Sequence, residues 1–165
     1  MLKRKMEDKI RHFFETQNKA LLITGARQTG KTFVIRQYAK TAGKNLVELN
    51  FLENENARKL FEGAANSRDI LLRISALTDV PLEKGKTIIF FDEVQECPEI
   101  VTAVKFLVEE GSYRYLLSGS LLGVELKDIR SIPVGYMDVF EMYPLDFEEF
   151  CRANGVSEHI LTVLR

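Results

Sequence analysis

Apolar residues recur at helical spacing at the start of the chain. Five of them fall on one helical face: Leu2, Met6, Ile10, Phe13 and Phe14. This pattern predicts an amphipathic first helix that ends near Glu15 and packs on the main body of the protein.

Short apolar runs follow at intervals and predict strands. They cover residues 20–23, 45–51, 87–91 and 113–117, with a fifth strand at 135–141. The run at 87–91 is the most apolar, and hydrophobicity on both faces is typical of a central strand in a parallel sheet. The strand at 45–51 is also expected to be mostly buried.

Helical patterns separate these strands. Helices are expected after residue 31, between 53 and 63, around 70–77, from Pro98 to about 108, and at 146–153, whereas the pattern assigns no element to 121–131. Four aromatic side chains are expected to point inward from these helices: Phe33, Phe106, Phe147 and Phe150. Strands that alternate with helices predict a right-handed, doubly wound α/β fold.

Composition limits the class of protein. The chain has 165 residues, 45% of them hydrophobic, and a net charge of −1, which fits a soluble domain. We expect a domain at 1–155 and the start of a truncated C-terminal region at 156–165. The sequence has no long uncharged apolar stretch, so a cytoplasmic location without membrane contact is expected. Cys97 and Cys151 lie far apart and are expected to be reduced, with no zinc site.

A phosphate-binding loop follows the first strand. The pattern G-x-x-x-x-G-K-T is formed by Gly25, Ala26, Arg27, Gln28, Thr29, Gly30, Lys31 and Thr32. Its glycines let the backbone turn around phosphates, and the following helix adds its positive end. We expect Lys31 to bridge the terminal phosphates and Thr32 to bind Mg²⁺.

Two acidic residues follow the strand at 87–91. Asp92 is the candidate for holding Mg²⁺, and Glu93 is the candidate for orienting the attacking water. Ser118 and Ser120 follow the fourth strand, and one of them, with Ser118 preferred, is a candidate sensor of the terminal phosphate. Because these clusters all follow strand ends, they can converge at one edge of a parallel sheet.

The motifs GARQTGKT, IIFFDEVQECPEI, YLLSGSLL and SIPVGYMDVFEMYPLDFEEF resemble a known family. They are similar to the N-terminal ATPase module of a prokaryotic group of AAA+ ATP-binding proteins that carry a C-terminal domain of unknown function. The resemblance implies the sheet order 5-1-4-3-2 and supports the roles given above to the phosphate loop, Asp92, Glu93 and the two serines. Many relatives have arginine where this chain has Tyr136, and Arg130 is a weak substitute for an arginine finger. The helical lid and the additional domain of such proteins are expected to be missing here.

The leading hypothesis is a Mg²⁺-dependent ATP-binding module that couples ATP hydrolysis to conformational work on an attached domain or partner. A GTPase is disfavoured because no Asn-Lys-x-Asp signature occurs, and a small-molecule kinase is disfavoured by the Asp92-Glu93 pair. A switch that binds nucleotide without hydrolysing it is the main alternative, and a homo-oligomer or a protein partner stays open.

Charge adds a weaker hypothesis. Residues 1–44 carry eleven Lys and Arg against three Asp and Glu, a net charge of +8, whereas residues 45–165 carry −9. A basic segment can attract nucleic acid, so a motor acting on DNA is a further alternative. The simpler interpretation is that these cations lie on solvated helix faces.

Overall fold

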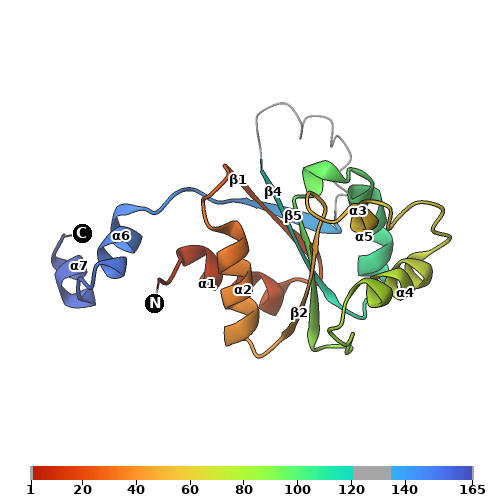
Figure 1. Ribbon diagram of the computed structural model, residues 1–165. Coiled ribbons are helices and arrows are strands. Elements are labelled where there is room, and N and C mark those ends of the chain that lie inside the picture. The colour runs from red at the N-terminus through yellow and green to blue at the C-terminus, as the bar shows by residue number, and fades with distance from the viewer. Residues whose placement is uncertain (1, 121–134, 165) are drawn as a thin grey trace.

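A parallel sheet forms the centre of the protein (Figure 1). The computed structural model describes residues 2–120 and 135–164. Within them the strands are β1 (Ala20–Gly25), β2 (Asn45–Asn50), β3 (Thr87–Asp92), β4 (Arg114–Ser120) and β5 (Met137–Glu141). All paired strands are parallel, in the order β2-β3-β4-β1-β5. This is the expected order 5-1-4-3-2 read from the opposite edge, so the predicted fold class is confirmed.

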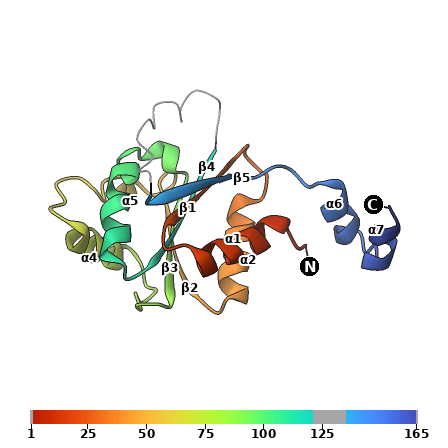
Figure 2. The same cartoon turned by 180° about the vertical axis from the view of Figure 1, so that it is seen from behind.

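Helices cover both faces of the sheet. They are α1 (Lys5–Thr16), α2 (Lys31–Thr41), α3 (Glu55–Arg58), α4 (Ser67–Leu77) and α5 (Glu99–Glu110), with a short 3-10 turn, η1, at Val94–Glu96. Figures 1 and 2 show α1 and α2 on one face and α3, α4 and α5 on the other. The predicted first helix therefore forms and packs on the body as expected.

The alternation of side chains along the strands produces two cores. Leu21 and Ile23 of β1 face α1 and α2, whereas Ala20 and Leu22 face the other layer. Because the central strands β1, β3 and β4 are covered on both sides, they need apolar residues at nearly every position. This requirement explains their continuous hydrophobic runs.

The expectation that residues 45–51 are mostly buried is wrong for β2. This strand lies at the edge of the sheet, where Val47 and Leu49 are buried but Glu48 is exposed and accepts hydrogen bonds from Arg36. An edge strand has a neighbour on one side only, so solvent reaches part of it.

The inward orientation expected for four phenylalanines is also wrong. Phe33 and Phe106 are 43% and 50% exposed because they lie off the buried stripes of α2 and α5. Phe147 and Phe150 lie on α6 (Phe147–Ala153) and are 67% and 56% exposed. The spacing of apolar residues correctly predicted a helix at 146–153, but α6 does not pack on the sheet.

The last two helices stand apart from the sheet. Both views show α6 and α7 (Glu158–Leu164) beyond the extended segment that follows β5, near the N-terminus (Figures 1 and 2). A capping box fixes the start of α6: the Asp146 side chain accepts from the Glu149 N–H, and the Glu149 side chain accepts from the Asp146 N–H. The capping box therefore sets the residue at which α6 begins.

Two expectations from composition concern cysteines and membranes. Cys97 and Cys151 are both free and buried, and burial raises the pKa of the Cys97 thiol to about 12. Within the described residues, the helices are too short or too polar to cross a bilayer.

Candidate functional site

The phosphate loop connects β1 to α2 through an unusual backbone path. Gly25 and Gly30 have φ values of 150° and 92°, and Gln28 has a φ of 62°. A Cβ added at Gly25 would lie 2.3 Å from the carbonyl oxygen of Met142, so any side chain there would clash with backbone. Glycine is therefore required at Gly25 by packing as well as by conformation.

The backbone N–H groups of Gln28, Gly30, Lys31 and Thr32 donate to no acceptor among the described residues. These groups include the first amides of α2, which have no partner within the helix. Such a set of free donors at the positive end of a helix is a site for an anion.

Lys31 lies inside the loop. Its side chain is buried, and Nζ donates to the carbonyl oxygens of Gly25 and Ala26 at 2.9 and 2.7 Å. Burial lowers the pKa of the lysine, while Glu93 and Asp92 raise it. The ammonium is thus held beside the unpaired loop amides, where it can exchange carbonyl oxygens for phosphate oxygens.

Asp92 is the polar centre of the site. Its Oδ2 accepts from Thr32 Oγ1 at 3.3 Å and from Asn50 Nδ2 at 3.4 Å, and its Oδ1 accepts from Ser118 Oγ and from the Glu93 N–H. The carboxyl is buried, and burial raises its pKa, whereas the hydrogen bond from Ser118 lowers it. The ends of β2, β3 and β4 and the start of α2 therefore meet at this carboxyl.

The residues at this point fit Mg²⁺. Thr32 supplies a hydroxyl oxygen and Asp92 a carboxylate oxygen, and this ion prefers a small number of protein oxygens completed by water and phosphate. Within residues 2–120 and 135–164, three or more His, Cys, Asp or Glu side chains nowhere gather to form a cage that would hold a metal alone. These two oxygens leave the remaining coordination positions of such an ion to water and to oxygens of a ligand.

Glu93 leaves β3 in a left-handed backbone conformation, with φ 58° and ψ 51°. A non-glycine residue pays about 1 kcal/mol or more for this conformation, which is common at functional sites. Its Oε2 accepts from Gln95 Nε2, and Gln95 Oε1 accepts from the Ser120 N–H at 3.3 Å. Gln95 thus connects the candidate catalytic carboxylate to the end of β4.

The two serines have different surroundings. Ser118 is buried within β4 and is committed to Asp92. Ser120 lines the cavity beside the loop, and its buried Oγ has no hydrogen-bond partner among the described residues. Ser120 is therefore the serine whose hydroxyl is free of a partner among the described residues.

Two adjoining cavities surround the loop. The first, of about 340 Å³, is lined by polar groups that include Lys31, Thr32, Glu93 and Ser120, with the exposed Arg27 at its edge. The second, of about 680 Å³, is lined by the loop together with four apolar side chains: Leu2, Phe33, Pro144 and Leu145. Both cavities share Gln28, Gly30 and Phe33, so the polar cavity and the more apolar one adjoin at the loop.

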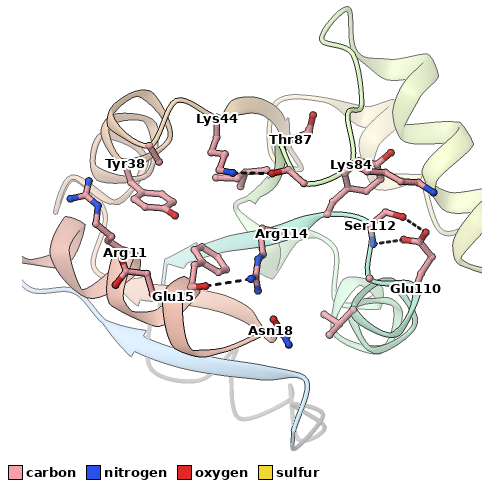
Figure 3. A pocket seen from close by; sticks show the side chains of 17 residues that line it. Arg11, Glu15, Asn18, Tyr38, Lys44, Lys84, Thr87, Glu110, Ser112 and Arg114 are labelled. Atoms are coloured by element: carbon pink, nitrogen blue, oxygen red, sulfur yellow. Dashed lines mark hydrogen bonds between the residues drawn. The ribbon is translucent and has the colours of Figure 1, made fainter.

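A larger cavity, of about 860 Å³, lies at the opposite edge of the sheet (Figure 3). Four cations line it: Arg11, Lys44, Lys84 and Arg114. Lys44 donates to the Gly85 carbonyl, and Arg114 donates to the carbonyls of Gln17 and Phe14. Figure 3 shows Arg11 and Lys84 on opposite sides of the pocket, so these charges do not converge on one ligand.

Residues outside the sequence-based site also contribute. The contacts that Asn50 and Gln95 make at this edge were not predicted. Asn50 ends β2 in register with Asp92, so a polar residue at the end of the neighbouring strand was the available signal. Tyr136 donates to Glu109 at 2.8 Å, away from the loop, while Arg130 lies outside the described residues.

The fold and the phosphate loop identify the class of protein. A parallel sheet with a phosphate loop after its first strand is the architecture of P-loop NTPases. A family model described as an AAA domain matches residues 17–151. This match covers most of the chain, so the chain belongs to the AAA domain family, a group of nucleotide-binding ATPase modules. No curated protein matches the chain.

Proposed function

We propose that this chain is an ATP-binding module that binds ATP with Mg²⁺ and hydrolyses it. The observation that carries the proposal is the contact between Thr32 and Asp92 beside the unpaired amides of the phosphate loop. The loop amides and Lys31 bind the phosphates, and the apolar cavity next to the loop accepts the base.

Each residue of the site has a separate proposed role. Thr32 and Asp92 hold Mg²⁺, which when bound would neutralise charge on the phosphates. Asn50 and Ser118 orient the Asp92 carboxylate, and Ser120 faces the terminal phosphate. Glu93 orients a water molecule for attack on the terminal phosphorus and accepts its proton, with ADP as the leaving group.

A nucleotide switch without hydrolysis is the second candidate, and one observation favours it. The Glu93 carboxylate accepts a hydrogen bond from Gln95. To contact a water molecule, this carboxylate must either lose that hydrogen bond or move together with the Gln95 side chain. A switch would bind ATP and release it unchanged.

The structure bears on the charge that motivates the DNA-motor alternative. Cations of the basic N-terminal segment pair with the acidic remainder of the chain: Arg4 with Glu149, Lys5 with Asp146, Lys19 with Asp138 and Arg36 with Glu48. Four of the eleven cations of residues 1–44 are therefore paired with the acidic remainder, and part of the charge asymmetry is internal ion pairing.

The conformational output is proposed to pass to an attached domain or partner through α6 and α7. These helices expose five large apolar side chains: Phe147, Phe150, Ile160, Val163 and Leu164. Steady-state release of phosphate from MgATP, measured beside equilibrium binding, tests the proposal: binding with turnover supports an ATPase, and binding without turnover supports the switch.

A further inference from the structure

Arg4 lies directly before α1 and is almost fully buried, with 5% of its surface exposed. Its guanidinium joins three separate parts of the chain. NH1 donates to the Thr29 carbonyl in the phosphate loop at 2.6 Å, NH2 to the Tyr143 carbonyl at 2.7 Å, and Nε to Glu149 Oε1 on α6 at 3.2 Å. A single planar group with fixed donor directions thus determines the distance between the loop and α6.

The contact with Thr29 affects the ligand side of the loop. A trans peptide is planar, so the Thr29 carbonyl and the Gly30 N–H point in opposite directions. Because Arg4 holds the carbonyl toward itself, the Gly30 N–H points away from Arg4. Gly30 is also the residue at which an added Cβ would lie 3.0 Å from Arg4 NH1, so the two groups are packed together.

The contact with Glu149 affects the position of α6. Glu149 is 5% exposed, its Oε1 also accepts from the Lys5 N–H at 2.8 Å, and its Oε2 completes the capping box. A buried carboxylate needs its partners, because loss of one leaves an uncompensated charge. The start of α6 is therefore fixed by the same guanidinium that fixes the loop.

We propose that Arg4 is a positioning residue that couples the phosphate loop to α6, so that nucleotide binding and the docking of α6 influence each other. This inference rests on the proposed nucleotide function. Coupling of this kind is reciprocal: if nucleotide alters the docking of α6, then α6 alters the affinity for nucleotide by the same factor.

The test uses Arg4→Gln with Lys5→Gln as its matched control. Lys5 also binds the start of α6, through Asp146 and Glu148 at 2.7 and 3.0 Å, but none of its hydrogen bonds and ion pairs among the described residues is with the loop. Nucleotide affinity and ¹H–¹⁵N amide shifts of residues 25–32 and 147–153 are measured for both variants, with and without a non-hydrolysable Mg²⁺–ATP analogue.

In the wild-type chain the analogue is expected to shift amides of both segments. In Arg4→Gln the analogue binds roughly tenfold more weakly, since a charge-assisted hydrogen bond is lost, and the shifts of α6 disappear while those of the loop remain. Lys5→Gln retains affinity and both sets of shifts. A merely structural role for Arg4 would lower stability without separating the two responses.

Loss of the Arg4 guanidinium leaves the Glu149 carboxylate buried without it. If Arg4→Gln fails to fold for this reason, the double variant Arg4→Gln/Glu149→Gln, which removes both buried charges, is measured in place of the single variant. In the nucleotide-free protein, Glu149→Gln must also shift the amide signal of Gly30, because Arg4 lies between Glu149 and the loop.

Three results would overturn the coupling: an unchanged Gly30 amide signal in Glu149→Gln, unchanged α6 signals when the analogue binds the wild-type chain, or α6 shifts that persist in the Arg4 variants. If the analogue does not bind the wild-type chain, the proposed function is refuted. The Gly30 amide signal of nucleotide-free Glu149→Gln still tests the coupling in that case.

Discussion

The hydroxyl of Thr32, in the first turn of α2, lies 3.3 Å from Oδ2 of Asp92 at the end of β3, although 60 positions separate the two residues. The sheet brings together two oxygen donors that suit Mg²⁺ beside a loop that suits phosphate. The proposed function depends on this pairing.

The first prediction concerns the metal. Thr32→Ala and Asp92→Asn should each weaken ADP binding in Mg²⁺ by about tenfold or more while leaving binding in EDTA nearly unchanged, because each removes a ligand. Calorimetric titration in the two buffers measures this difference. Thr41→Ala, in the same helix but bonded to Glu7 and Tyr38, is the control. Equal losses in both buffers would contradict the metal assignment.

The second prediction separates binding from chemistry. Glu93→Gln should retain MgATP binding and lower kcat by about 10²–10⁴, because an amide cannot accept the proton of the attacking water. Glu96→Gln, an exposed position in the same 3-10 turn, should leave kcat unchanged. Phosphate release under saturating MgATP checks both variants, and an unchanged kcat in Glu93→Gln would remove this residue from the mechanism.

The third prediction distinguishes the two serines. Ser118→Ala should lower the free energy of unfolding by about 1 kcal/mol, because Asp92 loses a buried hydrogen bond. Ser120→Ala should cost little in stability, since its hydroxyl has no partner among the described residues, but it should reduce affinity for ATP more than for ADP. Denaturant unfolding and nucleotide titrations provide the comparison. The assignment fails if the two variants behave alike.

The fourth prediction concerns pH. Burial raises the pKa of Asp92 above its usual value in the nucleotide-free protein, so the folded state holds this proton more tightly than the unfolded state does. Its contribution to stability is present below the ordinary carboxyl pKa and is lost as pH rises to the raised value. Asp92→Asn removes this titration, so its Tm should fall less than that of the wild-type chain between acidic pH and pH 7. Thermal unfolding of both proteins across pH 4–8 tests this, and an equal fall in Tm in the two proteins would contradict it.

The sequence predicted the site well where the functional residues are neighbours along the chain. The glycines, Lys31 and Thr32 occupy one short segment, so their spacing predicts the loop without knowledge of the fold. The apolar run before Asp92 predicts both the central strand and the end at which its carboxylate emerges. The sheet order was predicted through the family resemblance, and the structure confirms it.

The sequence was uninformative where contacts join remote segments. The contact of Arg4 with Thr29 and the contact of Gln95 with Ser120 depend on how the N-terminal segment and η1 lie against the loop and β4. Neither contact leaves a periodic signal. Phe147 and Phe150 illustrate a different limit, because helical spacing identifies an apolar face but does not identify what covers it.

The most direct test of the central claim is the fifth prediction: equilibrium binding of MgATP to the wild-type chain and to Lys31→Ala. The ammonium lies against the loop carbonyls at 2.7 and 2.9 Å and is proposed to transfer to phosphate oxygens when ATP binds. We predict saturable binding by the wild-type chain and a loss of at least about a hundredfold in the variant, as expected when a charged partner of phosphate is removed. Equal affinity of the two proteins, with both folded, would contradict the account.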